Sequence, residues 1–244
     1  MYYKILGVKY HITVDSFYID APQIVKEFPI DLLNLKNLTT LRIENNYLTC
    51  LPENIEKLIL LKKLCIVNNS LQFVPNNIGK LIHLEILNLE SNQLKSLPET
   101  IGALTKLKIL NLKNNFICQL PKSIDKCISL TELDLSNNRL THLSENLGNL
   151  RNITKITLDN NKIKYLSLNI RKIRECFKTK TVDLYDIDNL DYDCEIVIIS
   201  KLNISLLNLP FGLKEIWLYN PMKIDIKIPF GCELYVDNIK QNKK

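Results

Sequence analysis

Glycine is scarce in this chain, which has only six glycines among 244 residues. Loops that cradle phosphate groups depend on clustered glycines, because the backbone must approach the ligand closely. The sequence contains no G-x-G-x-x-G, no P-loop and no H-E-x-x-H. The known glycine-rich nucleotide sites and the common zinc-protease site are therefore not expected.

Histidine is also rare, with single residues at His11, His83 and His142. They are widely separated, and none stands in a pattern that pairs a nucleophile with a base. We therefore predict no catalytic residues, no cofactor-binding residues and no metal ligands. This disfavours an enzyme.

Long apolar runs are absent, since none approaches the roughly 18 residues that cross a bilayer. The N-terminal stretch MYYKILGVKYHITVDS is interrupted by Lys4 and Lys9 and does not read as a signal peptide. From this we expect no membrane partner.

Cysteine is present but irregular. The seven residues are odd in number and scattered, and no C-x-x-C occurs. A disulfide framework or a zinc site has denser and more regular spacing. The pattern favours a reducing intracellular compartment, and we predict a cytoplasmic protein.

The net charge of +6 is small, with 32 basic and 26 acidic residues. The one basic stretch, RKIRECFKTK (171–180), is followed by the acidic stretch DLYDIDNLDYDCE (183–195). Adjacent opposite charges can offset each other on a solvated edge, and we favour this interpretation over a nucleic-acid or nuclear-import segment. We predict no nucleic-acid partner.

What the chain does contain is a repeat. From position 38 onward, six copies of L-x-x-L-x-L-x-x-N-x-L recur at a constant step of 23 residues, with isoleucine able to replace leucine. The copies are LTTLRIENNYL, LKKLCIVNNSL, LEILNLESNQL, LKILNLKNNFI, LTELDLSNNRL and ITKITLDNNKI. Such self-similarity indicates a stacked-repeat architecture.

The two halves of each unit predict different local structures. Alternation in L-x-L predicts a short strand, so that Leu133 and Leu135 face one way and Asp134 the other. The second half reads L-P-x-x-I-x-x-L, in which proline ends regular pairing and two apolar groups share one side of a helical turn. One unit cannot bury both apolar edges alone, whereas stacked units bury them in a continuous core.

These motifs resemble the leucine-rich repeat family. The second halves of the units are similar to its intracellular 23-residue class, which is found in Ras-suppressor and plant Ras-group-related proteins. They read LPENIEKL, VPNNIGKL, LPETIGAL and LPKSIDKC. The resemblance implies an α/β repeat solenoid, a horseshoe with a concave parallel β-sheet and short helical or extended segments on the convex side. We predict a single domain over 1–244, with a cap and irregular first unit (1–27), regular repeats (28–173), and degenerate repeats with a cap (174–244).

The drifting C-terminal part contains LPFGLKEIWLYN (209–220) and IPFGCELYVDN (228–238), which resemble one another and are similar to the FNIP-type repeat. These segments predict shorter final units. Terminal units of a stacked protein must close off its apolar end, so drift from the motif is expected there. With these units, we expect a solenoid of about eight to ten units.

Asparagine recurs after every strand. An amide carries two donors and an acceptor, so it can bond the backbone of its own turn and of the next unit. The resemblance implies this structural role for a ladder of six residues: Asn46, Asn69, Asn92, Asn115, Asn138 and Asn161. The asparagines that precede five of them lie at a variable position and are expected to be solvated: Asn45, Asn68, Asn114, Asn137 and Asn160.

Individual cysteines fall at informative places in the repeat. Cys127, Cys194 and Cys232 stand where leucine would, and are expected to be small buried hydrophobic residues. Cys65 stands at the outward centre of a strand, where either a reactive thiol or an inert surface thiol fits, and we favour the inert one.

A partner-binding surface follows from the stacking, because outward strand residues form columns on the concave face. Val67, Ile86, Ile109 and Phe116 are apolar where solvent-facing residues are expected, which is typical of a binding centre, although scattered surface apolar residues are common. The predicted partner-binding residues are Arg42, Glu44, Tyr47, Cys65, Val67, Ile86, Asn88, Ile109, Asn111, Phe116, Asp134 and Arg139.

We therefore predict a monomeric, non-catalytic module for protein–protein interaction. The resemblance implies an intracellular scaffold or adaptor in signal transduction that binds a protein partner on the concave face. An alternative is a pathogen-encoded effector or decoy that binds a host signalling or ubiquitin-pathway protein. Richness in asparagine, isoleucine and lysine fits an AT-biased genome, although the repeat itself requires much of the asparagine.

Overall fold

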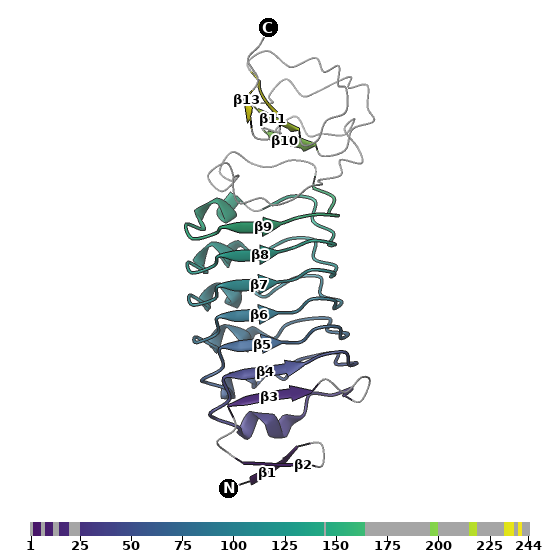
Figure 1. The fold of residues 1–244 in the computed structure, drawn as a ribbon, viewed down its shortest axis with the longest axis vertical. Coiled ribbons are helices and arrows are strands. Elements are labelled where there is room, and N and C mark those ends of the chain that lie inside the picture. The colour runs from purple at the N-terminus through teal and green to yellow at the C-terminus, as the bar shows by residue number, and fades with distance from the viewer. Residues whose placement is uncertain are drawn as a thin grey trace.

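A seven-stranded parallel sheet dominates the computed structural model (Figure 1). The structure describes residues 2–5, 8–11, 15–19, 25–143, 145–163, 196–199, 215–218, 232–236 and 239–240. The strands follow sequence order: β3 (Ser16–Ile19), β4 (Thr40–Ile43), β5 (Lys63–Cys65), β6 (Ile86–Asn88), β7 (Ile109–Asn111), β8 (Glu132–Asp134) and β9 (Lys155–Thr157).

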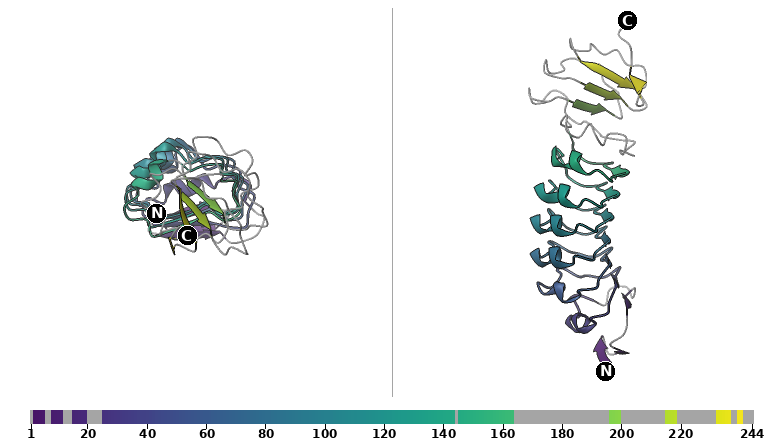
Figure 2. Two further views of the ribbon diagram at one scale, coloured as in Figure 1. Left: turned by 90° about the horizontal axis from the view of Figure 1, so that it is seen from above. Right: turned by 90° about the vertical axis from the view of Figure 1, so that its left-hand side faces the viewer.

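The register of the sheet follows the repeat. Leu64 pairs with Leu87, Leu87 with Leu110, and Leu110 with Leu133, so each step is 23 residues. Only the step from β3 to β4 differs, because Ser16 pairs with Thr40. The strand of the irregular first unit is therefore part of the same sheet, which is open and uncurled over these seven strands (Figure 2).

The opposite side of each unit is a short 3-10 helix. In this helix residues i and i+3 eclipse, so the I-x-x-L spacing places Ile101 and Leu104 on one buried side. Proline precedes several of these helices in an extended conformation, as Pro98 does with ψ of 151°. The helices are η1 (Ile30–Asn34), η2 (Ile55–Lys57), η3 (Asn76–Lys80), η4 (Glu99–Ala103), η5 (Lys122–Lys126) and η6 (Glu145–Asn149).

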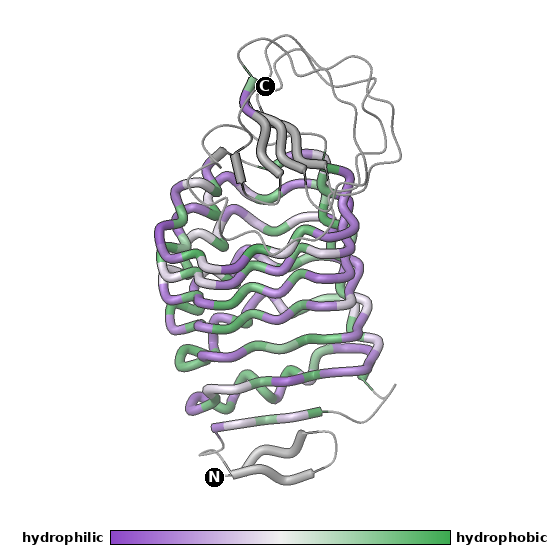
Figure 3. Tube along the Cα trace, turned by 45° about the horizontal axis from the view of Figure 1, so that its top comes forward, coloured by the Kyte–Doolittle hydropathy of each residue, from purple (hydrophilic) through white to green (hydrophobic). Residues whose placement is uncertain are grey.

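The core lies between the sheet and the helices and runs as one cluster from Phe17 to Ile163. Leucines from both layers fill it, and Leu87, Leu89 and Leu104 are fully buried. The hydropathy of the chain alternates along each turn of the stack (Figure 3), as expected when one side of every element faces inward. The leucine-rich repeat solenoid predicted from the sequence is thus the observed fold.

The asparagine ladder lies at the end of the strands, where the backbone turns within the stack. The Oδ1 atom of Asn115 accepts from the N–H of Leu94 at 3.0 Å, and its Nδ2 donates to the carbonyls of Leu89 (2.9 Å) and Leu112 (3.0 Å). Asn92, Asn138 and Asn161 repeat this pattern. The unit that receives these bonds is the preceding one and not the next one, which corrects the sequence-based expectation.

The residue before each ladder asparagine has a positive φ, between 50° and 58°. Asparagine tolerates this left-handed region better than other residues with a Cβ atom. The side chains at this position also bond to one another: Asn68 Nδ2 donates to Asn45 Oδ1 at 2.9 Å, and Asn114 Nδ2 donates to Ser91 Oγ at 3.1 Å. These side chains are exposed or half-buried, as expected of solvated residues, and the positive φ and the bonds between units are features that the sequence did not indicate.

A third row of contacts links the helices. Asn77 Nδ2 donates to the carbonyl of Glu53 at 2.7 Å, and Thr100 Oγ1 donates to that of Asn76 at 2.7 Å. Ser123 and Asn146 make the same bond to the preceding unit. The signal was present in the sequence but missed: the second variable residue of L-P-x-x-I is asparagine, threonine or serine in every unit from Asn54 onward.

Two glycines set how closely the helices stack. A Cβ atom on Gly79 would lie 2.4 Å from the carbonyl oxygen of Thr100, and one on Gly102 would lie 2.5 Å from that of Ser123. Real Cβ atoms do not approach oxygen so closely, so these positions exclude any larger residue without a backbone shift.

Two smaller sheets complete the described part. Strands β1 (Tyr2–Ile5) and β2 (Val8–His11) form an antiparallel pair within the predicted cap. Strands β10 (Ile196–Ile199), β11 (Glu215–Leu218) and β12 (Glu233–Val236) pair in parallel at steps of 19 and 18 residues, and β13 (Ile239–Lys240) closes the sheet antiparallel. The segments 171–180 and 183–195, and Cys194, lie outside the described residues.

Within the described ranges, no helix is both long enough and apolar enough to cross a membrane. Cys127 and Cys232 are fully buried, as the replacement of leucine predicted.

We expect Asn92→Ala to lower the free energy of unfolding by about 1–3 kcal/mol, because it leaves the buried N–H of Leu71 and the carbonyl of Ile66 without their partner. Urea unfolding followed by circular dichroism measures this. Gln93→Ala removes an exposed amide next to it and should change the value by less than about 0.5 kcal/mol. Equal effects of the two substitutions on the free energy of unfolding would contradict a structural role for the asparagine ladder.

We expect Gly79→Ala to destabilise the protein by about 1–3 kcal/mol, because the new methyl group overlaps the backbone of the next helix. Lys80→Ala, at the exposed neighbouring position, serves as the control and should be close to neutral. A neutral Gly79→Ala in the same thermal unfolding assay would show that the helices can separate without cost.

Candidate protein-interaction surface

The outward side of the sheet forms the candidate surface. We call the strand face the outward side chains of β4–β9 together with the turn residues that follow these strands. The register places Arg42 beside Cys65, Cys65 beside Asn88, and Asn111 beside Asp134. The central column predicted from the sequence therefore exists as a row of neighbouring side chains.

One residue of this row was missed. Tyr18 of β3 pairs with Arg42, and its side chain is 58% exposed at the start of the central column. No repeat motif surrounds Tyr18, so its place in the sheet could not be identified without the structure.

The apolar part of the strand face centres on β6 and β7. Ile86 and Ile109 are direct neighbours in the sheet, and both are half-buried. Lys63 and Glu132 flank them in the same column. Val67 is half-buried in another column, two residues along the chain from Cys65. The result is a small apolar centre with a charged rim, which is the usual arrangement of a protein-binding site.

An aromatic–cation pair lies at the turn that follows these strands. The guanidinium carbon of Arg139 lies 4.2 Å from the ring centroid of Phe116. Such a stack contributes about 0.5–1 kcal/mol at an exposed site. Aromatic residues and arginine are also the types that most often dominate binding energy at interfaces. Tyr47, two-fifths exposed in the equivalent turn of an earlier unit, adds a second aromatic group.

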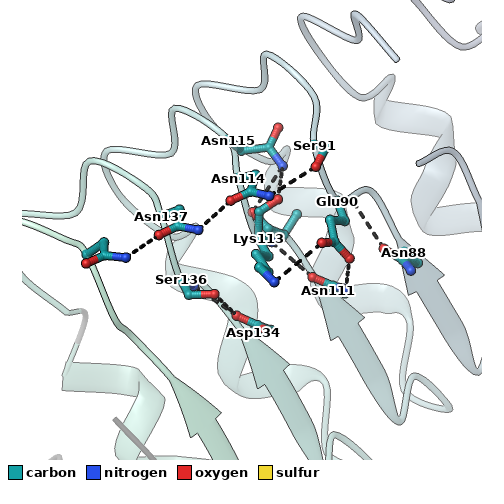
Figure 4. Close-up of polar contacts among 12 residues, drawn as sticks. Asn88, Glu90, Ser91, Asn111, Lys113, Asn114, Asn115, Asp134, Ser136 and Asn137 are labelled. Carbon is teal, nitrogen blue, oxygen red and sulfur yellow. Dashed lines mark hydrogen bonds and ion pairs between the residues drawn. The ribbon is translucent and has the colours of Figure 1, made fainter. Parts of the chain in front are cut away.

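The polar centre of the strand face is held by local hydrogen bonds (Figure 4). Asn88 Oδ1 accepts from the N–H of Glu90 at 3.1 Å, and Asn111 Oδ1 accepts from that of Lys113 at 3.0 Å. Asp134 Oδ1 likewise accepts from the N–H of Ser136 at 2.9 Å. Side chains that bond the backbone two residues on fix the strand ends in one conformation. These residues therefore have a structural role beside any contact with a partner.

Charged side chains on this face also pair with one another. Glu90 accepts from Asn111 Nδ2 at 3.0 Å and lies 3.7 Å from Lys113 Nζ. Glu44 lies 3.2 Å from Arg42 Nε. Side chains held in this way would lose less conformational entropy if a partner bound to this face.

Cys65 is not a surface thiol. Its exposed fraction is 1%, and burial raises the pKa of the thiol, although a hydrogen bond with Arg42 opposes this shift. The physical reason is size: the short cysteine side chain lies between the longer Arg42 and Asn88 on the flanking strands. The expectation of an exposed thiol was wrong, whereas an unreactive thiol agrees with its burial.

The structure also describes a further buried thiol and the surroundings of two histidines. Burial, aided by the nearby charge of Asp125, raises the pKa of the Cys127 thiol to about 12. His83 Nδ1 lies 3.2 Å from Lys106 Nζ, and His142 Nδ1 lies 3.2 Å from the hydroxyl of Thr141. Within the described residues, no group of three or more histidines, cysteines or acidic residues comes together to hold a metal ion.

Comparison with solved structures finds the same solenoid in other proteins. A leucine-rich repeat protein of Leptospira interrogans, LIC12759, is 23% identical with a TM-score of 0.58, over 87% of this chain and 64% of that one. The functional domain of InlJ from Listeria monocytogenes is 21% identical with a TM-score of 0.60, over 93% of this chain and 49% of that one. At these identities the likeness shows the fold alone.

A third structure is the ectodomain of the Arabidopsis thaliana receptor kinase GASSHO1/SCHENGEN3, in complex with CASPARIAN STRIP INTEGRITY FACTOR 2. It is 29% identical with a TM-score of 0.56, over 63% of this chain and 19% of that one. The chain thus spans less than two thirds of the length of each of these three proteins.

No curated protein sequence matches the chain. A family model described as a leucine-rich repeat region matches residues 53–198, and a model of the single leucine-rich repeat matches residues 37–58. The finer assignment to the 23-residue class stays a prediction. Because the first of these models matches more than half of the residues, the chain belongs to the leucine-rich repeat family.

Proposed function

We propose that this chain is a non-catalytic module that binds a protein partner through the strand face. The observation that carries the proposal is the apolar pair of Ile86 and Ile109 on the strand face, which also carries the exposed stack of Phe116 and Arg139 in the turns after the strands. Locally bonded polar side chains hold the surrounding surface in place. Leucine-rich repeat proteins are generally interaction modules, which supports the same role here.

The proposed role is that of an intracellular scaffold or adaptor in signalling, and the proposed location is the reducing cytoplasm. The five cysteines whose side chains the structure describes are all free thiols, which supports a reducing compartment. The Arabidopsis ectodomain was crystallised with a bound factor, which supports binding as the activity of a related solenoid.

The effector or decoy alternative would use the same face. The neighbours from Leptospira and Listeria share the fold at an identity that carries no functional argument. A scaffold and a decoy would therefore be separated by the identity of the captured partner.

We expect the double variant Ile86→Lys with Ile109→Lys to lose partner capture and keep its fold. Half-buried positions on an open sheet let the lysine stem lie along the surface, while the charge disrupts an apolar contact. Affinity capture from the native cell, with mass spectrometry, measures the loss of the partner. Circular dichroism checks the fold.

The matched control is Ile30→Lys with Phe73→Lys, which makes the same change in charge at exposed apolar residues outside the strand face. Its captured partner should be the same as that of the unchanged protein. If the strand-face variant captured the partner equally well, the strand face would not be the binding site.

The Cys65 thiol tests the enzyme alternative. Since burial raises its pKa, the thiol stays protonated to higher pH than an exposed one, and we expect slow alkylation at pH 8. Peptide-resolved mass spectrometry should show Cys50 and Cys118, both exposed, modified first. Rapid modification of Cys65, together with a catalysed turnover that Cys65→Ser abolishes, would contradict the proposal.

A further inference from the structure

Large aliphatic side chains lie exposed on one edge of the stack, where each 3-10 helix leads into the next strand. We call this the turn edge and define it as residues 34–39, 57–62, 80–85, 103–108, 126–131 and 149–154. Ile59, Ile82 and Ile128 are 56%, 55% and 60% exposed, and Leu60 is 41% exposed. The core and the strand face use none of them.

The turn edge also concentrates positive charge. It holds eight basic residues and one acidic residue, whereas the rest of residues 34–163 holds eight basic and ten acidic residues. The one acidic residue, Glu85, is paired with Lys108 at 2.7 Å. All eight basic residues are exposed: Lys36, Lys57, Lys62, Lys80, Lys106, Lys108, Lys126 and Arg151.

Stacking brings these residues onto one edge of the molecule, where equivalent positions form rows. Successive parallel strands lie about 4.8 Å apart, so the turns that precede them are spaced by the same step. When the stack is viewed along its axis, the described units largely overlie one another with a small shift from unit to unit (Figure 2), so equivalent turns form a continuous row. Ile59 and Ile82 lie on neighbouring turns, and Ile128 lies two turns further on. Side chains at the tips of collinear turns can all touch one flat surface.

The composition of the turn edge differs from that of a protein interface. Interfaces are enriched in aromatic residues and arginine and depleted of lysine, a description that fits Phe116 and Arg139 on the strand face. The turn edge has aliphatic tips, and lysine supplies all but one of its cations. Lysine clusters are attracted to anionic lipids, while aliphatic groups enter the boundary between head groups and acyl chains.

We propose that the turn edge docks the chain on an anionic lipid surface, with its lysines among the head groups and Ile59, Ile82 and Ile128 in the boundary region. Docking of this kind is peripheral and needs no segment that spans the bilayer. The expectation of no membrane partner rested on the absence of such a segment, and therefore did not consider this edge.

Co-sedimentation of the full chain with vesicles tests the proposal, using phosphatidylcholine alone and phosphatidylcholine with phosphatidylserine at about 7 to 3. We expect binding to the mixed vesicles that falls as salt is added, and little binding to phosphatidylcholine alone. A triple variant should have a partition coefficient for mixed vesicles on the order of 100-fold lower, since each basic residue near the surface raises that coefficient about fivefold. Its substitutions are Lys57→Glu, Lys80→Glu and Lys126→Glu. The double variant Ile82→Ser with Ile128→Ser should have a partition coefficient about tenfold lower, because it removes apolar side chains from the boundary region.

Matched controls separate the turn edge from net charge and from general stickiness. The charge control makes the same change in charge at exposed positions elsewhere, by Lys95→Glu, Lys122→Glu and Lys162→Glu. The apolar control removes exposed apolar groups elsewhere, by Ile30→Ser with Phe73→Ser. Both controls should bind mixed vesicles nearly as the unchanged protein does. Circular dichroism on every variant checks that the fold is retained.

Three results would overturn the proposal. One is no preference of the unchanged protein for the mixed vesicles. Another is an equal loss in the turn-edge and control triple variants, which would indicate net charge alone. The third is binding of poly-glutamate through the turn edge without binding of vesicles, which would indicate an acidic protein partner.

Discussion

The structure depends on how the backbone is satisfied where each strand turns inside the stack. A buried carbonyl or N–H without a partner costs as much as a lost hydrogen bond, and these turns are closed off by the units on either side. The amides of Asn92, Asn115 and Asn138 satisfy their own turn and the preceding unit at once. One side chain thus holds both the local turn and the stacking, so a unit is complete only when another precedes it.

Every surface of the molecule follows from this stacking at one constant step. When each unit superposes on the last, a position in the repeat becomes a row in space, and whatever the sequence places there is repeated along it. The rows on the strand face bring Ile86 next to Ile109, while those on the turn edge collect lysines and isoleucines. The helix rows instead stack so closely that Gly79 and Gly102 are required. Structure and recognition therefore use different rows of one scaffold.

Much of this could be predicted from the sequence. Leucine spacing predicted the strands, their parallel order and their register, because a 23-residue step leaves no other way to bury both edges of a unit. It also identified the columns that contain Arg42, Ile86 and Ile109. Tyr18 and the helix row of Asn77 and Thr100 were missed, the first because no motif surrounds it and the second because a mixture of asparagine, threonine and serine does not look like a repeat.

The sequence by itself determined the fold. Its leucines and asparagines recur at the same positions in every unit, so each unit buries the same apolar side chains and makes the same hydrogen bonds to its neighbour. Only the tertiary structure decided the state of individual side chains. It showed that Cys65 is covered by Arg42 and Asn88, and that the residue before each ladder asparagine must adopt a positive φ. It also showed that the dispersed basic residues of the turn edge are exposed along one edge of the stack. Exposure, conformation and surface charge depend on what neighbouring units place beside a residue, and a pattern along the chain does not contain that information.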